Sequence, residues 1–285
     1  MGRVAVVVFS YYPADPRVRR EAEALVEAGH QLKLFCLREL DEPKGELIRG
    51  VEVNRLPLSR TLKAGWLQYP AQYFVFTLLA FLKVSWMNLF ERFDAVHVHN
   101  MPDFLVAASV VPKLLGARVI LDLHDPMPEV MITKYGLHHS HVLVRMLRFI
   151  ERICIQYADV VLTPNEAFRQ LFLARGAPED KVHIVMNSPQ ESLFQVAAKP
   201  ERVPGGKGIA RPPVLMYHAM TLDFQCVEDI LVAVARTRKE LPKVQLRVFG
   251  QATPETVARL RKVSEKLGLE HELEYGGKIP LESVV

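Results

Sequence analysis

The sequence has few cysteines and little net charge. Its 285 residues include only three cysteines, Cys36, Cys154 and Cys226, and 36 basic against 32 acidic side chains, a net charge of +4. An odd number of isolated cysteines excludes a disulfide framework and favours a reducing compartment. A charge this small gives no general attraction to nucleic acid, and no stretch interleaves basic residues with stacking aromatics. We therefore expect a cytoplasmic protein with no nucleic-acid partner.

The amino terminus lacks the features of a secretion signal. In MGRVAVVVFSYY the apolar run is short and no small-residue cleavage site follows it. We predict that this run forms the first strand of a sheet.

Short β-branched segments alternate with longer helical ones along the chain. This alternation predicts β-α-β units and a doubly wound parallel sheet of the α/β class, covered on both faces. The predicted strands are residues 4–9, 31–37, 51–56, 95–98, 118–123, 160–163 and 182–186. The predicted helices are residues 17–28, 68–90, 104–115, 142–157 and 166–175.

The composition changes after Phe194, where QVAAKPERVPGGKGIARPP has no apolar periodicity. Such a Pro- and Gly-rich stretch is typical of a linker. We predict a first domain over residues 1–195, a linker over 196–212 and a second domain over 213–285. The second domain has predicted strands at 213–218, 244–249 and 273–275 and helices at 227–241 and 254–267. Three strands are half of a doubly wound sheet, so this domain is predicted to be incomplete.

Three arginines, Arg17, Arg19 and Arg20, occupy the first turn of a predicted helix that Asp15 and Pro16 begin. Cations there oppose the helix dipole, at about 0.3 to 1 kcal/mol each. Glutamates one turn later can compensate them, or a phosphate can bind there, because open α/β sheets bind ligands at such helix starts. The preceding loop has no Gly-x-Gly-x-x-Gly, which argues against a dinucleotide and hydride chemistry.

Polar residues follow two of the predicted central strands. In DAVHVHNMPDF, strand alternation places His97 and His99 on one face. Hydrogen-bonded structural histidines are commoner there than metal ligands, so we expect no metal. Asn100 and Asp103 follow at the strand's carboxyl end, where Asp103 is expected to receive a substrate hydroxyl.

The next strand ends in VILDLHDPMPE, which brings His124, Asp125 and Glu129 to the same sheet edge. Three titratable groups leaving an apolar strand are the strongest chemical signal in the chain, although Asp125 and Pro126 can also simply form a turn. Asn165 and Asn187 follow later strands, where asparagine either caps a helix or faces a cleft.

The segment AGWLQYPAQYFVFTLLAFL has no charge for nineteen residues, near the length of a bilayer span. Gln68, Pro70 and Gln72 interrupt it, which argues against a transmembrane helix. Two alternatives remain, a helix buried in the core and an amphipathic helix at the inner surface of the membrane, reaching from Trp66 to Phe90.

Several motifs in order resemble the family-4 glycosyltransferases of the GT-B fold. They are YYPADPRVRREAEALVEAGH, FDAVHVHNMPDFL, ILDLHDPMPE, ERICIQYADVVLTPNE, VMNSPQESLF and the YH that opens the second domain. The resemblance implies two Rossmann-like domains and the retaining transfer of a sugar from a nucleotide donor, without a metal or other cofactor. It also implies an acceptor glycan or glycolipid, often lipid-linked or a surface-polysaccharide precursor.

The resemblance assigns roles to individual residues. His124 matches the family histidine near the donor sugar and phosphate and is the predicted catalytic residue. Asn100, Asp103, Asp125 and Glu129 are expected to fix the loops or meet the acceptor. The three arginines would face a phosphate, and the remaining predicted cleft residues are Asn165, Asn187 and His218.

The second domain departs from the family pattern. Ala219 stands where glycine is expected, and the loop after it carries Asp223, Gln225 and Cys226 without a Lys or Arg for the donor pyrophosphate. The family's Glu-x7-Glu pair is matched by Glu274 and Glu282 only in spacing, so we expect the true pair beyond Val285 and little turnover from residues 1–285 alone. Two alternatives stay open: a nucleotide-sugar epimerase of similar fold and a non-catalytic binding module.

Overall fold

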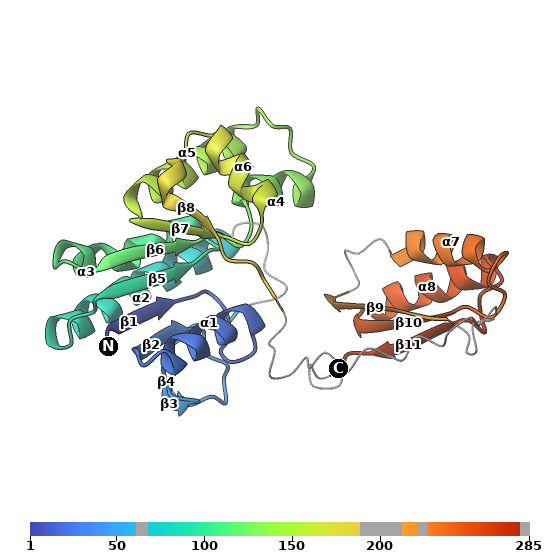
Figure 1. Cartoon of the computed structure of the whole chain (residues 1–285), viewed down its shortest axis with the longest axis horizontal. Helices are drawn as coiled ribbons and strands as arrows, with labels where there is room; N and C mark the ends of the chain where they lie inside the picture. The colour runs from blue at the N-terminus through green and yellow to red at the C-terminus, as the bar shows by residue number, and fades with distance from the viewer. Residues whose placement is uncertain (61–67, 189–212, 222–226, 280–285) are drawn as a thin grey trace, which may run out of the picture. The chain divides into compact units, whose positions relative to one another are not determined.

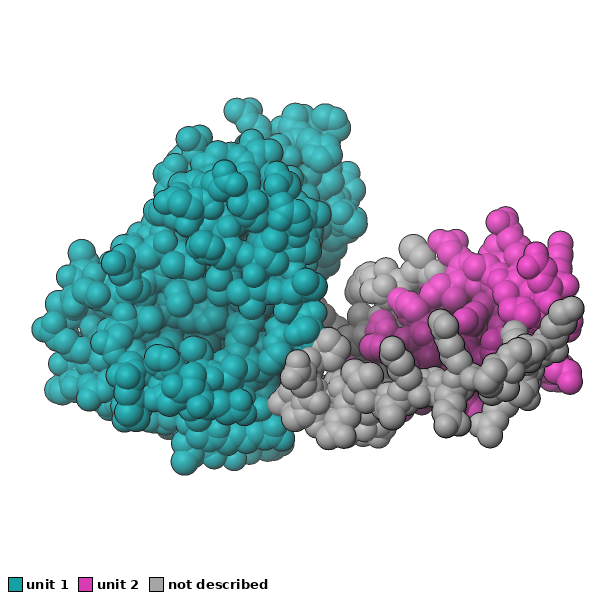
Figure 2. Space-filling view, in the orientation of Figure 1, with its two compact units in different colours: residues 1–188 teal, residues 189–285 magenta. Residues whose placement is uncertain are grey.

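The computed structural model describes residues 1–60, 68–188, 213–221 and 227–279 (Figure 1). The chain forms two compact units, Met1–Ser188 and Pro189–Val285, coloured separately in Figure 2. The predicted boundary at residue 195 and the linker at 196–212 lie outside the described residues, as do Trp66, Asp223, Gln225, Cys226 and Glu282.

The first unit is built on an eight-stranded sheet of order β3-β4-β2-β1-β5-β6-β7-β8. Its strands are β1 Arg3–Val7, β2 Gln31–Cys36, β3 Gly45–Ile48, β4 Val51–Arg55, β5 Ala95–His99, β6 Arg118–Asp122, β7 Val160–Thr163 and β8 Val182–Ile184. The predicted doubly wound α/β class is confirmed. One detail is wrong, because the edge strand β3 was not predicted and pairs antiparallel with β4. Its segment is mostly exposed and has no continuous apolar run, so the sequence gives little strand signal there.

Helices connect the strands of the first unit. They are α1 Pro16–Glu27, α2 Gln68–Phe90, α3 Val110–Leu114, α4 Met127–Tyr135, α5 Val142–Tyr157 and α6 Glu166–Ala174, with 3-10 turns η1 Asp103–Ser109 and η2 Glu179–Lys181. Two predictions need correction. The predicted helix 104–115 is η1 followed by the short α3, and the segment after Asp125 forms α4 where we predicted only a loop.

Successive side chains of a strand point to opposite faces of the sheet, and this alternation shows which face α1, α2 and α5 cover. Val96 and Val98 of β5 pack in one cluster with Phe76, Ala80 and Val84 of α2. Val119 and Leu121 of β6, in register with Val96 and Val98, pack against α5. Thus α2 and α5 cover the same face, which we call the α2 face. The opposite α1 face packs Val18 and Ala22 of α1 against the alternate residues of β1, β2 and β4.

The second unit contains a parallel three-stranded sheet of order β11-β10-β9. Its elements are β9 Val214–Thr221, α7 Val227–Thr237, β10 Gln245–Gln251, α8 Pro254–Lys266 and β11 Leu273–Gly277. The predicted order of strands and helices is confirmed, including the position of Glu274 within a strand.

Candidate functional site

The strand order of the first unit reverses at β1, which pairs with β2 on one side and with β5 on the other. Open α/β sheets bind ligands outside the carboxyl ends of the strands at such a reversal. The loops after β1, β5 and β6 meet there. They carry Asp15 and Arg17, then Asn100, then His124 and Asp125.

A buried polar cluster lies on the α1 face just below this edge, and we call it the histidine cluster: Glu21, His97, His99, Asp122 and His124. Asp122 Oδ2 lies 3.3 Å from His99 Nδ1 and 3.6 Å from His97 Nε2. Glu21 reaches down from α1, with Oε2 3.8 Å from His97 Nε2. The sequence motifs did not indicate Glu21 or Asp122 as site residues. Asp122 ends β6, two positions before His124, and was therefore recognisable from the sequence, whereas the packing of α1 on the sheet was not.

Burial and neighbouring charges shift the pKa values in this cluster in opposite directions. Burial, reinforced by nearby Asp122, raises the pKa of Glu21 to about 7. Burial alone would raise the pKa of Asp122, but the neighbouring imidazoles of His97 and His99 outweigh it and hold that pKa well below its usual range. Burial lowers the pKa of His99 to about 3, with His97 adding to the effect. At neutral pH, Asp122 is therefore ionised and His99 is neutral.

Four of these side chains have the chemistry of a metal site. Ligand atoms of Glu21, His97, His99 and Asp122 all lie within 4.8 Å of one another. Glu21 Oε2, His97 Nε2 and His99 Nε2 are buried without a hydrogen-bond partner. Imidazole nitrogens and carboxylate oxygens are the donors that zinc and other transition metals accept.

His124 lies at the top of the histidine cluster with 6% of its surface exposed. Its Nε2 is 2.9 Å from His99 Nδ1, and the two rings stack with centroids 5.2 Å apart. Burial lowers the pKa of His124, the charge of Asp122 acts against this, and Arg17 supports it. The predicted catalytic residue thus has polar neighbours at the ligand-binding edge.

Asn100 links the β5 and β6 loops. Its Nδ2 donates to Asp103 Oδ1 at 2.9 Å and to the Asp125 carbonyl at 2.7 Å, and its Oδ1 accepts from the His124 amide at 2.9 Å. Asp103 is 1% exposed, and burial raises its pKa to about 6. Asp103 faces the protein interior, so its expected contact with a substrate hydroxyl is not supported, and it instead holds Asn100.

Each of the three arginines at the start of α1 has an acidic neighbour. Arg17 pairs with the N-cap Asp15 at 3.2 Å, Arg19 with Glu23 at 4.0 Å and Arg20 with Glu21 at 3.8 Å. The expected Arg19–Glu23 compensation is therefore present. Arg17 keeps 38% of its side chain exposed, the largest fraction of the three, and its charge acts on His124.

The other predicted residues make local contacts. Arg20 donates to the Asn187 side chain at 3.3 Å, so two predicted site residues bind each other. Asn165 caps α6 by accepting from the Phe168 amide. Glu129 forms an ion pair with Arg175, which also binds the buried Glu151, and this network joins α4, α5 and α6. His218 is exposed on β9 in the second unit.

Residues 14–188 match the sequence profile of the glycosyl transferase 4-like domain, which covers the loops and helices just described. The chain belongs to the glycosyl transferase 4-like family.

Known proteins similar to this family member agree with the fold. Chitobiosyldiphosphodolichol beta-mannosyltransferase of Debaryomyces hansenii is 19% identical over 242 residues, 82% of this chain and 49% of that protein. The chain thus spans about half the length of this curated relative. Sucrose-phosphate synthase from Thermosynechococcus elongatus superposes with a TM-score of 0.69 at 17% identity, over 100% of this chain and 72% of that one. Anabaena Alr3699/HepE in complex with UDP gives 0.65 at 15% identity, over 100% and 71%. These likenesses establish the GT-B fold.

The α2 face of this glycosyl transferase 4-like unit contains a large apolar cavity of about 710 Å3. We call it the α4–α5 cavity; Tyr73 from α2, Met101 from the loop after β5, Phe104 from η1, Met131 from α4, and Leu147 and Ile150 from α5 line it. The ionisable residues of its lining are Arg60, Lys134, His141 and tyrosines. Sequence analysis missed this cavity because it did not predict α4.

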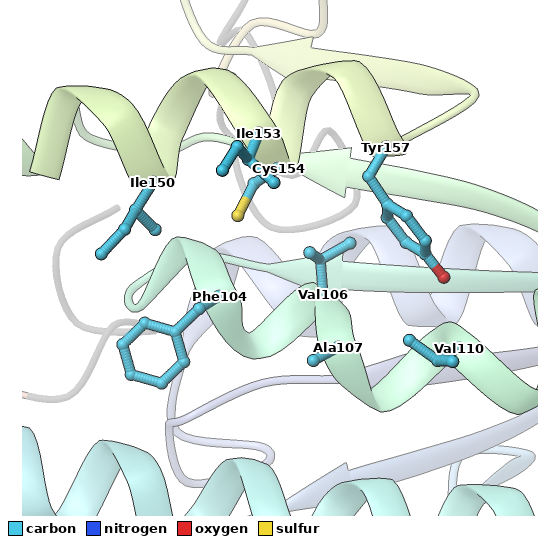
Figure 3. Close-up of a pocket in the computed structure, with 8 residues that line it drawn as sticks. All are labelled: Phe104, Val106, Ala107, Val110, Ile150, Ile153, Cys154 and Tyr157. Carbon is cyan, nitrogen blue, oxygen red and sulfur yellow. The ribbon is translucent and has the colours of Figure 1, made fainter.

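A smaller apolar cavity of about 330 Å3 lies between η1, α3 and α5. Phe104 and Ile150 line both cavities. Figure 3 shows these two side chains at one end of the smaller cavity, with Val110 and Tyr157 at the other.

Helix α2 is both a core helix and an exposed apolar surface. Phe76, Ala80 and Val84 are fully buried against the sheet, whereas Phe74, Leu78, Leu82, Trp86 and Phe90 are 48 to 71% exposed. Among the described residues, α2 is the helix long and apolar enough to span a bilayer. Because one side of α2 packs on the sheet, its length and composition alone are weak evidence that it spans a membrane.

Proposed function

We propose that this chain carries the acceptor-binding domain and part of the donor domain of a retaining glycosyltransferase. The match of residues 14–188 to the glycosyl transferase 4-like domain carries this proposal. The polar edge at the strand reversal supports it, because a nucleotide sugar offers phosphates to Arg17 and hydroxyls to the loops. The bond between the sugar's anomeric carbon and the donor phosphate oxygen would break and release the nucleoside diphosphate. The acceptor hydroxyl oxygen would form the new bond to that carbon, and its proton would pass to the departing phosphate.

His124 would act as a neutral hydrogen-bond donor to the donor sugar or its phosphate. His99 Nδ1 lies 2.9 Å from His124 Nε2 and 3.3 Å from Asp122 Oδ2. We propose that His99 carries its proton on Nδ1, shared between the ionised Asp122 and His124 Nε2, which leaves the proton of neutral His124 on Nδ1. Asp122 and His99 would then fix the tautomer of His124.

We propose that transfer uses no bound metal, even though Glu21, His97, His99 and Asp122 could hold one. The neighbouring imidazoles already lower the pKa of Asp122 and stabilise that carboxylate without an ion. Activity retained after dialysis against a strong chelator would agree with this, and activity restored only by an added divalent ion would refute it.

The acceptor is proposed to be lipid-linked or a surface-polysaccharide precursor, bound at the inner face of the membrane. The Debaryomyces hansenii relative is named for a diphosphate-linked lipid, chitobiosyldiphosphodolichol. The exposed apolar side chains of α2 also support a membrane contact. Exposed basic residues lie among the apolar ones, Lys83 on α2 and Arg145 and Arg152 on α5. Apolar side chains with interspersed cations suit an anionic membrane surface.

Vesicle sedimentation tests this contact. We expect the chain to bind vesicles that contain an anionic lipid better than neutral ones. Leu82→Ser should weaken this binding, whereas Leu40→Ser, which changes a leucine that is 91% exposed in the β2–β3 connection, should not. Equal effects of the two changes would refute a role for α2.

The activity test compares residues 1–285 with the product of the whole reading frame, using labelled UDP- and GDP-sugars and lipid-phosphate acceptors. We expect transfer with retained anomeric configuration from the longer protein and little from residues 1–285. In the longer protein, His124→Ala should lower kcat by about 100-fold or more while the thermal midpoint changes little. Unchanged kcat would remove His124 from the mechanism. An altered sugar formed without acceptor would indicate an epimerase, and absence of nucleotide binding would indicate a binding module.

A further inference from the structure

The α4–α5 cavity is large and apolar, and exposed residues such as Lys134 and Tyr135 line part of it, so a ligand can enter it from solvent. A cavity of about 710 Å3 is in the usual range of small-molecule binding sites, roughly 300 to 1,000 Å3. Its methionine, leucine, isoleucine and aromatic lining offers an apolar ligand contact without hydrogen-bonding requirements.

The cavity begins beside the ligand-binding edge of the sheet. Met101 follows Asn100 directly, and Met127 lies two residues beyond Asp125, and both line the cavity. A molecule in the cavity would therefore have one end next to the loops that carry the predicted site residues.

The smaller cavity provides a path away from that edge. Phe104 and Ile150 separate the two cavities and line both of them. The two cavities thus adjoin along α5, and the smaller one extends to Tyr157 (Figure 3). Two adjoining apolar cavities suit a long flexible chain better than a compact ligand.

Two cations line the α4–α5 cavity without an opposing charge. Lys134 Nζ stands over the rings of Tyr69 and Tyr135, at 5.1 and 5.4 Å, and the Arg60 guanidinium stands over Phe9 at 5.5 Å. Within the described part of the chain, neither forms an ion pair with a carboxylate. A phosphate at the end of an apolar chain would supply the missing negative charges.

We propose that the α4–α5 cavity binds the apolar chain of a lipid-phosphate acceptor and that Arg60 and Lys134 bind its phosphate. This inference rests on the proposed function and names the acceptor class. Each methylene buried in the cavity would tighten binding about fourfold, so affinity should rise with chain length until the cavities are full. The sugar-accepting end would then lie at the edge of the sheet near His124.

The test measures binding without any donor, so it does not depend on sugar transfer. Calorimetry on the purified chain uses farnesyl phosphate and dodecyl phosphate below their micelle concentrations, with farnesol and inorganic phosphate as the probes that lack one half of the ligand. We expect both lipid phosphates to bind at least tenfold more tightly than either half-probe. Tighter binding of farnesyl phosphate would indicate a prenyl chain, and tighter binding of dodecyl phosphate an acyl-type chain.

Variants locate the binding. Met131→Trp fills the cavity from α4, and Ile150→Trp blocks the passage to the smaller cavity; each should weaken farnesyl phosphate binding at least tenfold. Lys134→Ala should weaken binding of farnesyl phosphate but not of farnesol. Leu40→Trp, in the exposed β2–β3 connection and outside both cavities, is the matched control and should change nothing. Circular dichroism and the thermal midpoint show whether each variant is folded.

Two results would overturn the inference. One is farnesyl phosphate binding that is unchanged in folded Met131→Trp and Lys134→Ala. The other is no binding of either lipid phosphate by the wild-type chain while the longer protein transfers sugar to a water-soluble glycan, which would leave the proposed function intact. Loss of sugar transfer with lipid binding retained would instead refute the proposed function alone.

Discussion

The two faces of the same sheet edge have opposite chemistry. On the α1 face, His97, His99 and Asp122 form a buried polar cluster, while on the α2 face Val98 and Leu121 lie under an apolar helical layer. Val98 and His99 are adjacent in β5, and Leu121 and Asp122 are adjacent in β6, with both pairs in register. Because successive side chains of a strand point to opposite faces, one residue step separates the two environments. The same two strand ends therefore present a polar cluster on one face and an apolar wall on the other.

The sharpest test of this comparison is Asp122→Ala. Asp122 is the buried carboxylate beside the imidazoles of His97 and His99, at 3.6 and 3.3 Å, and its removal takes a buried negative charge away from them, so we expect a loss of about 3 to 5 kcal/mol in the free energy of unfolding at pH 7. The pKa of Asp122 is lowered in the folded state, so its contribution is present above a pH of about 4 and is lost as pH falls below it. The difference between wild type and variant should therefore shrink at low pH, as measured by urea unfolding. A difference of the same size at pH 3 and pH 7 would contradict this.

The neighbouring change, Leu121→Ala, tests the apolar face. Leu121 is fully buried against α5, so we expect a loss of about 2 to 4 kcal/mol from lost apolar contacts and a residual cavity. No titratable group is removed, so this loss should stay constant between pH 4 and pH 8. A strong pH dependence in the same urea experiment would show that the two faces are coupled.

We expect Glu21→Gln to increase the free energy of unfolding at high pH, a smaller effect than that of Asp122→Ala and opposite in sign. Burial raises the pKa of Glu21 in the folded state to about 7, so its protonated form favours folding below a pH of about 4.5, and this contribution is lost as pH rises through 7. Glutamine stays neutral, so the variant should be more stable than wild type at pH 8, by on the order of 1 to 2 kcal/mol, and similar to it at pH 4.5. Parallel stability curves for the two proteins would mean that Glu21 stays ionised.

Much of the fold was predictable from local sequence. The β-branched runs gave every strand of the central sheet except β3, and the Pro16 and Asp15 signals gave the start of α1 to within a residue. The exception has a physical reason: β3 is an exposed edge strand, which needs no apolar pattern. Helix α4 after Asp125 was not predicted. It has only nine residues, with a proline at the second position, and this is too short for its apolar residues to show a clear helical period.

Sequence by itself determined which residues reach the ligand-binding edge, because parallel strands bring their carboxyl ends together wherever the chain crosses over. It also determined that His97 and His99 share a face, since strand period is fixed by backbone geometry. Only the tertiary structure decided which groups meet across elements: Glu21 over the imidazoles, Asn100 between two loops, Arg20 beside Asn187, and α4 closing a cavity with α5. Those contacts depend on helix placement and side-chain packing, which distant parts of the chain set together.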